Sequence, residues 1–269
     1  MCNAFGQKRN SGRTPGRWRA AVWLMLIPAF TLPLSAGAAE PTAEDVQARE
    51  ILGRADRIRF PTEGFQVEVV ITTSAPDAEP EERAYRILSK GNNQTVVLTT
   101  APEIDRNQML LMRDRDLWAF LPNLTQAIRL PLSQRLTGQV ANGDLARANF
   151  SGDYEPKILR QEKIDGETYH VLALDAVDQW VTYRRVLYWV NAKNDRPFKA
   201  EFYAVSGRLL KTCHYFGFQA LGGATRPTRL VIEDALRGGH RSVLEYSAMK
   251  LRDLPDKIFT KDYLKKLGS

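Results

Sequence analysis

The spacing of apolar residues predicts one helix near the start of the chain. Pro41 and Thr42 precede acidic residues, an arrangement typical of a helix N-terminus. Apolar residues then recur at helical spacing, at Ala48, Ile51, Leu52, Ala55 and Ile58. The opposite face is expected to carry the charged residues Arg49, Glu50, Arg54, Asp56 and Arg57. Phe60-Pro61 is expected to end the helix, which would pack on a sheet.

From Gly64 onward the apolar residues alternate with polar ones, which predicts strands. Phe65, Val67, Val69 and Ile71 would lie on one face of the first strand. Similar segments follow to about residue 252, separated by Gly, Asn and Pro turn signals such as Asp165-Gly166. No long helix separates them, so we expect an antiparallel meander of about ten or eleven strands rather than a parallel α/β sheet.

One ribbon, RDLWAFLPNLTQAIRLP at residues 115–131, is apolar on both faces. A half-buried strand would alternate, so both faces of this ribbon need a cover. Of the two possible faces, we predict that the aromatic pair Trp118 and Phe120 points inward.

Residues 131–154 interrupt the strand pattern with a Gly-, Asn- and Ser-rich stretch. A long loop within a compact domain is usually functional or mobile. Its scattered apolar residues suggest a lid that fills a groove when the groove is empty; the predicted lid residues are Leu132, Leu136, Val140 and Phe150.

The strands carry more bulky apolar groups than one buried face needs. A sheet of this length must curl or split into layers. If it curls, one face packs on the helix and the other lines a concavity; a filled β-sandwich would use the same residues. Periodicity does not separate these two architectures.

The N-terminus has the order of a secretory signal peptide. Five basic residues and no acid lie in residues 1–39, where an apolar stretch from Ala20 to Leu34 leads to Ser35-Ala36-Gly37-Ala38-Ala39. The apolar stretch is shorter than the roughly 20 residues of a spanning helix. We therefore predict cleavage of residues 1–39, Sec-type export to a Gram-negative periplasm, and a single domain over residues 40–269.

Removal of this leader changes the charge balance. The chain has 38 Lys and Arg against 31 Asp and Glu, and the loss of five basic residues leaves 33 against 31. Such a nearly neutral domain does not suggest a nucleic-acid partner. Cys213 would be the only remaining cysteine, so no internal disulfide is expected and Cys213 is read as a small buried hydrophobe.

Residues with catalytic or metal-binding chemistry are sparse. His170, His214 and His240 show no metal-ligand spacing, and Cys213 and His214 would point to opposite faces of one strand. Glu233 and Asp234 also straddle a strand. We therefore predict no enzyme activity, no catalytic residue, no metal and no cofactor.

Eight stretches together resemble the LolA-like outer-membrane lipoprotein-sorting proteins of Gram-negative bacteria. They are ILGRADRIRFP, FQVEVVI, LWAFLPNLTQAIRL, ANGDLARANFSGDYEP, VTYRRVLYWV, RPFKAEFYAVSGRLLKTCHYF, RPTRLVIEDAL and SVLEYSAMKLRDLPDKIFTKDYL. They cover essentially the whole predicted mature chain. The resemblance implies a mainly β fold: a curved, unclosed antiparallel β-barrel with an apolar concave face, an N-terminal helix and a helical lid.

The resemblance also implies a function as a chaperone-like periplasmic carrier. Such a carrier binds a lipid or the acyl chains of a lipoprotein and moves it between an inner-membrane exporter and an outer-membrane acceptor, without a membrane span of its own. The groove residues that we predict are Val67, Val69, Ile71, Ile87, Leu98, Trp118, Phe120, Leu187, Trp189, Phe202, Leu230 and Ile232. A module that senses lipids or lipoproteins without transporting them is the alternative, and a lipid hydrolase is a third class.

Overall fold

The computed structural model describes residues 41–268 apart from residue 123. The predicted signal peptide lies outside these residues. From Pro41 onward the chain forms one compact unit. Within the described residues no helix is both long and apolar enough to cross a membrane.

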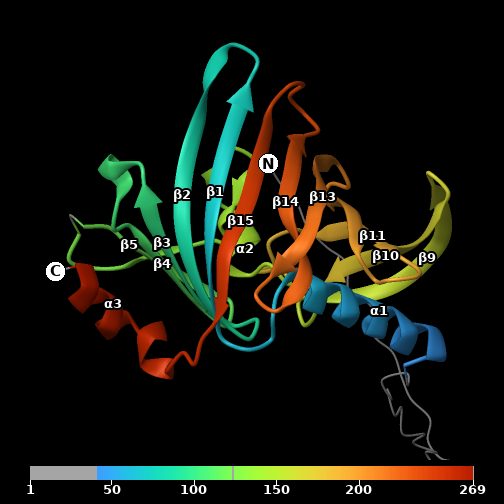
Figure 1. Cartoon of the computed structure of the whole chain (residues 1–269), viewed down its shortest axis with the longest axis horizontal. Coiled ribbons are helices and arrows are strands. Elements are labelled where there is room, and N and C mark those ends of the chain that lie inside the picture. The colour runs from blue at the N-terminus through green and yellow to red at the C-terminus, as the bar shows by residue number, and fades with distance from the viewer. Residues whose placement is uncertain (1–40, 123, 269) are drawn as a thin grey trace, which may run out of the picture. The chain divides into compact units, whose positions relative to one another are not determined.

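A single thirteen-stranded antiparallel sheet dominates the described part of the chain (Figure 1). Its strands in chain order are β1 (Phe65–Ala75), β2 (Ala78–Lys90), β3 (Gln94–Ala101), β4 (Met109–Arg113), β5 (Asp116–Phe120), β6 (Ile128–Leu130), β9 (Tyr154–Ile164), β10 (Glu167–Ala176), β11 (Arg185–Asn191), β12 (Pro197–Tyr203), β13 (Leu209–Leu221), β14 (Ala224–Asp234) and β15 (Arg241–Leu251).

The strand order confirms the predicted meander and its open ends. The sheet runs β6-β5-β4-β3-β2-β1-β15-β14-β13-β12-β11-β10-β9, so β6 and β9 are its unjoined edges and the barrel is not closed. Strands that follow each other in the chain are neighbours within β1–β6 and within β9–β15, and pairing of β15 with β1 joins the two runs into one sheet. The expected count of ten or eleven was too low, because short pieces such as the three-residue β6 also pair.

Helix α1 (Ala43–Arg59) confirms the predicted helix and its start. The Thr42 hydroxyl accepts a hydrogen bond from the Asp45 amide, and the Asp45 carboxylate accepts one from the Thr42 amide. The helix ends at Arg59, and Phe60, next to Pro61, is its extended C-cap residue. One expectation was wrong: Asp56, assigned to the solvent face, is buried.

The two faces of the sheet have different covers. We call the face that packs on α1 the inner face; its core includes Ile51, Leu52 and Ala55 of α1. The other, outer face is covered at β3–β5 by the one-turn helix η2 (Asp256–Phe259) and by α3 (Lys261–Gly268). Figure 1 shows α3 beside β5 and α1 on the side of β9 and β14.

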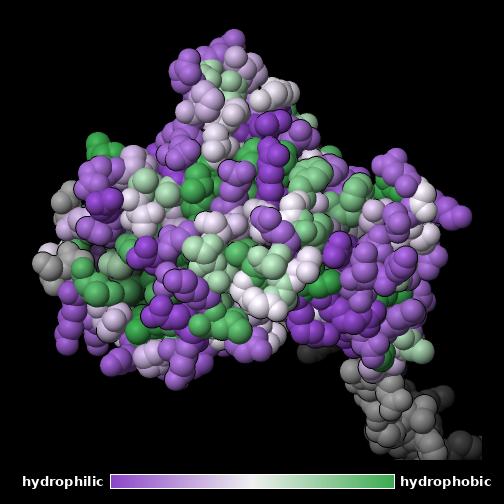
Figure 2. Space-filling model, viewed as in Figure 1, coloured by the Kyte–Doolittle hydropathy of each residue, from purple (hydrophilic) through white to green (hydrophobic). Residues whose placement is uncertain are grey.

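The two covers explain the apolar ribbon at residues 115–131. Leu117 of β5 belongs to the inner core, whereas Trp118 and Phe120 belong to the outer cluster beneath α3. The Lys261 ammonium lies 3.9 Å from the centroid of the Trp118 ring. Both sides of β5 are therefore covered by the chain itself, whereas Leu124 and Ile128 in the second half of the ribbon are exposed. On the space-filling surface, hydrophobic residues show on the side of β3–β5 and α3, and the β1–β2 tip is hydrophilic (Figure 2).

Residues 131–154 are more ordered than a loop. They contain a small hairpin of β7 (Arg135–Thr137) and β8 (Val140–Ala141), followed directly by α2 (Asn142–Ala146), before β9 begins. A further single turn, η1 (Glu103–Asp105), connects β3 to β4. The 131–154 segment lies on the inner face, where its apolar residues join the core.

Candidate ligand-binding site

Seven of the predicted groove residues share the inner face. Val67, Val69 and Ile71 come from β1, and the other four come from strands β2, β12 and β14. These other four residues are Ile87, Phe202, Leu230 and Ile232. All seven are buried in one core. Strand alternation places every second side chain of these strands on this face.

The other five predicted groove residues lie on the outer face, so their assignment was wrong. Leu98, Trp118 and Phe120 pack with the η2 and α3 residues. Leu187 and Trp189 join a separate outer cluster with Tyr169, Val171 and Phe198. The large aromatic side chains do not mark the inner side here, because the outer face also has apolar covers.

The 131–154 segment fills the inner face. Leu132, Val140 and Phe150 are buried in the inner core, and Leu136 is half-buried against it. The Phe150 ring packs edge-on against Tyr188 of β11 at a centroid distance of 5.1 Å and against Tyr154 at 5.6 Å. The cavity left between the segment and the sheet holds about 30 Å³. Pockets for drug-sized ligands hold about 300–1,000 Å³, so a lipid tail fits here only if the segment moves.

A buried ion pair ties α2 to the sheet. The Lys211 ammonium of β13 lies 2.5 Å from the Asp144 carboxylate of α2 and donates a second hydrogen bond to the Gln139 carbonyl at 2.8 Å. The Tyr183 hydroxyl donates to the same carboxylate at 3.0 Å. Burial raises the pKa of Tyr183 well above its ordinary value, and Asp144 raises it further, so Tyr183 remains a donor. Lys211 and Tyr183 thus hold Asp144, and with it α2, against the sheet.

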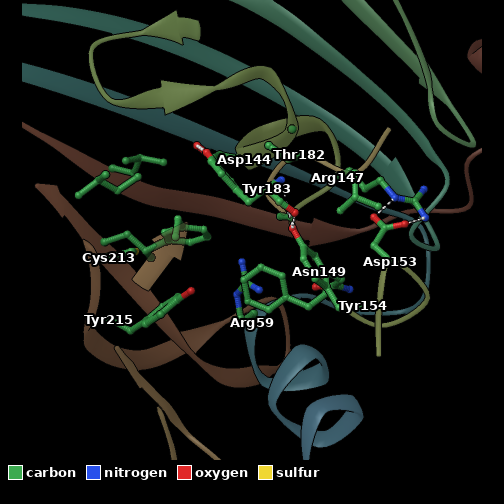
Figure 3. A pocket seen from close by; sticks show the side chains of 18 of the residues that line it. Arg59, Asp144, Arg147, Asn149, Asp153, Tyr154, Thr182, Tyr183, Cys213 and Tyr215 are labelled. Atoms are coloured by element: carbon green, nitrogen blue, oxygen red, sulfur yellow. Dashed lines mark hydrogen bonds and ion pairs between the residues drawn. The ribbon is translucent and has the colours of Figure 1, made fainter. Parts of the chain in front are cut away.

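A second buried pair holds the other end of α2. Arg147 forms an ion pair with Asp153 (Figure 3) and donates to the backbone carbonyls of Asn92 at 2.7 Å and Asp114 at 2.6 Å. Arg115 also pairs with Asp153. Removing one partner of a buried pair leaves an uncompensated charge, so these contacts specify the position of the segment.

The third tether joins the segment to α1. The buried Asp56 carboxylate accepts hydrogen bonds from the Phe150 amide at 3.1 Å, the Ser151 amide at 2.7 Å and the Ser151 hydroxyl at 2.7 Å. Burial raises the pKa of Asp56, while Arg59 and these donors lower it. On α1, Asp56 comes four residues after Leu52 and Arg59 comes four residues after Ala55, and both Leu52 and Ala55 belong to the apolar stripe. Helical periodicity could therefore have placed both of them toward the core.

An open groove adjoins the small cavity. It holds about 670 Å³ and is lined by the β10–β11 loop, the end of β12 and the start of β13. Val181, Thr182 and Tyr183 line both the groove and the cavity, so they form the wall between them. Gly143 of α2 packs on this wall, where an added Cβ would lie 2.1 Å from the Thr182 hydroxyl oxygen. This contact leaves no room for a side chain at position 143 unless one element shifts.

The residues that line the cavity include one thiol and several charged side chains. Cys213 is buried, and burial raises the pKa of its thiol to about 12, so it is present as a neutral thiol near pH 7. Among residues 41–268 other than 123, no group of three or more His, Cys, Asp and Glu residues could hold a metal ion. The cavity is lined by aromatic and aliphatic side chains together with Arg59, Asp144 and Arg147.

Comparison with solved structures gives the family. A LolA superfamily protein from Nitrosomonas europaea is 60% identical to this chain, with 80% of this chain and 98% of the other covered and a TM-score of 0.78. The chain belongs to the LolA superfamily. A protein-family model described as an uncharacterized protein matches residues 91–266.

Two more distant structures share the fold of this LolA-superfamily protein. An outer membrane lipoprotein-sorting protein domain from Vibrio parahaemolyticus is 20% identical, with 82% and 99% coverage and a TM-score of 0.71. A DUF1329 family protein from Desulfovibrio piger is 17% identical, with 83% and 100% coverage and a TM-score of 0.72. A comparison with curated proteins finds no match.

Proposed function

We propose that this protein is a periplasmic carrier that binds a lipid, or the acyl chains of a lipoprotein, on its inner face. It would move this cargo between the inner and outer membranes after export and cleavage of residues 1–39. The observation that supports the proposal is an apolar inner face that is covered, beside α1, by one segment held by polar tethers. A lipoprotein-sorting domain of the same fold is consistent with it.

In this proposal the 131–154 segment is the lid. Phe150, Val140 and Leu132 occupy the inner face, and the tethers at Asp144, Arg147 and Asp56 keep them there. An acyl chain would displace these side chains and use the same apolar surface. Burial of a 16-carbon chain stabilises the complex by on the order of 10 kcal/mol, which can offset the loss of the lid contacts.

The polar character of the tethers also makes opening of the lid possible. When the lid opens, the charged groups can be hydrated by water instead of remaining buried and unpaired. The open groove at Thr182 and Tyr183 lies where the moving segment meets solvent. We infer that cargo enters through this groove.

Native mass spectrometry of the protein purified from its own cell envelope tests the binding step. A lipid mass released on activation supports the proposal. Absence of bound lipid, together with no uptake from fluorescently labelled vesicles, would contradict it.

Transfer to unlabelled acceptor vesicles then separates a carrier from the alternative, a sensing module. A carrier speeds the transfer in proportion to its concentration. A sensor binds lipid but leaves the transfer rate unchanged, and that result would overturn the transport part of the proposal.

A further inference from the structure

Arg59 is a cation placed against the inner face with incomplete hydrogen bonding. It is the last residue of α1, and its side chain is 7% exposed. Its Nη1 lies 3.5 Å from the Asp56 carboxylate, which makes an ion pair without a hydrogen bond. Neither Nε nor Nη1 has a hydrogen-bond partner among the described residues. Arginine always carries its charge, so these donors cannot be removed by deprotonation.

The neighbours of Arg59 compensate its charge only in part. The Asp56 carboxylate is already an acceptor for Phe150 and Ser151. The guanidinium carbon lies 4.6 Å from the Phe150 ring centroid and 5.5 Å from that of Tyr215, and both distances allow cation–π attraction. An aromatic face stabilises the charge but does not accept directed hydrogen bonds as an oxygen does. The free donors therefore favour a ligand oxygen.

The small cavity lies beside this guanidinium. Figure 3 shows the Arg59 side chain reaching from α1 into the space near Tyr215 and Asn149. The cavity of about 30 Å³ has room for two or three water-sized groups, because each needs about 10–15 Å³. Asn149 also lines it and has an unpartnered Oδ1. The space suits a small polar group attached to a chain rather than the chain itself.

A neutral oxygen fits the charge balance better than an anion. Asp56 and Arg59 together are neutral, and Lys211 is likewise paired with Asp144. A buried carboxylate would add an uncompensated negative charge close to Asp56, which is costly. An ester carbonyl accepts a hydrogen bond and adds no net charge.

We propose that Arg59 binds the ester carbonyl of an acyl chain and makes the site selective for ester-linked lipids over ether-linked ones. This inference rests on the proposed function and adds the chemical class of its cargo. The acyl chain beyond the carbonyl would run along the inner face in place of Phe150. Arg59 is then the residue that fixes how far a chain enters.

Two lipids that differ only at the carbonyl test the proposal. Lauroyl lysophosphatidylcholine and its dodecyl ether analogue are titrated separately into the mature chain, residues 40–269, and affinities are measured by calorimetry. We expect the ester to bind about 10-fold more tightly, because a hydrogen bond to a charged donor contributes at least that ratio. In Arg59→Met the two affinities should become equal.

Arg226→Met is the matched control. Arg226 is 4% exposed, and its donors are occupied by the backbone carbonyls of Leu221, Arg57 and Ile58. Its loss should lower stability but keep the preference for the ester. If Arg59→Met does not fold because Asp56 is left unpaired, the double variant Asp56→Asn/Arg59→Met removes both charges and replaces it.

Equal affinities of the wild-type protein for ester and ether would overturn the inference while leaving lipid carriage intact. Dodecanoate binding far more tightly than the ester would also overturn it, since the site would then select an anion. Failure of every amphiphile to bind would contradict the proposed function itself, and this inference with it.

Discussion

Phe150 gives a direct way to separate a lid from an ordinary core. It is 6% exposed and packs on Tyr188, Tyr154 and the Arg59 guanidinium. Truncation of a buried Phe to Ala typically lowers the free energy of unfolding by about 3–5 kcal/mol. We expect Phe150→Ala to fall in this range.

The same substitution should improve lipid binding. If Phe150 occupies the site of the acyl chain, its loss removes contacts that hold the protein in the closed state and enlarges the cavity. Apparent affinity rises with the fraction of binding-competent protein. A 10-fold increase in apparent lipid affinity corresponds to about 1.4 kcal/mol. It therefore requires only a part of the lost 3–5 kcal/mol to come from contacts that stabilise the closed lid.

Phe259→Ala is the matched control, because Phe259 is 1% exposed but lies in the outer cluster of η2 and α3. Urea unfolding gives the stability of both variants, and displacement of a fluorescent fatty acid gives their lipid affinities. Phe259→Ala should lose similar stability without a gain in affinity. An equal change of affinity in both variants, or no gain in Phe150→Ala, would refute the assignment of Phe150 to the lid.

Three further substitutions test other parts of the account. Lys211→Met leaves the Asp144 carboxylate without its cation and should lower the free energy of unfolding by about 3–5 kcal/mol. Amide hydrogen exchange in residues 139–146 should become faster, and unchanged exchange there would argue against a tether. Trp118→Ala removes only an outer-face contact, so urea unfolding should show lower stability and lipid displacement should show unchanged affinity; a large loss of affinity would mean that lipid uses the outer face. Burial, and to a smaller extent Lys199, lower the pKa of His214 below its ordinary 6.5. As the pH drops below 6.5, the unfolded chain therefore protonates His214 before the folded protein does, and the free energy of unfolding should fall. His214→Gln should make the free energy of unfolding less dependent on pH, and an unchanged dependence would exclude His214 as its source.

Period-two alternation was sufficient to predict most of the sheet. Val67, Val69 and Ile71 lie on one buried face as expected, and the Asp165-Gly166 turn joins β9 to β10. The open edges and the strand count were less accessible, because they depend on pairing between distant segments. No local pattern near residue 65 indicates that β1 pairs with β15.

The choice of face could not be predicted where both faces are apolar. Trp118 and Leu117 are equally suited to a buried position, and the position of α3 decides between them. The ion pair of Asp144 and Lys211 could not be predicted from the sequence either, because the two residues are 67 positions apart and only the fold brings them together. Asp56 and Arg59 were accessible in principle, from their spacing on α1.

The account depends most on movement of the 131–154 segment, and a reversible tether tests this movement directly. A Cβ at position 143 would lie 3.1 Å from the Thr182 Cβ, a few tenths of an ångström below the range for a disulfide. After a shift of a few tenths of an ångström, a disulfide in Gly143→Cys/Thr182→Cys would lock α2 to the groove wall when oxidised. Cys213 is buried and should not interfere.

The decisive measurement is lipid uptake by this double variant before and after reduction, with wild-type protein treated in parallel. We expect the oxidised form to take up little lipid, the reduced form to recover uptake, and the wild type to be unaffected by reductant. Equal uptake by the oxidised and reduced forms would contradict the central claim, because lipid would then bind without displacing the segment.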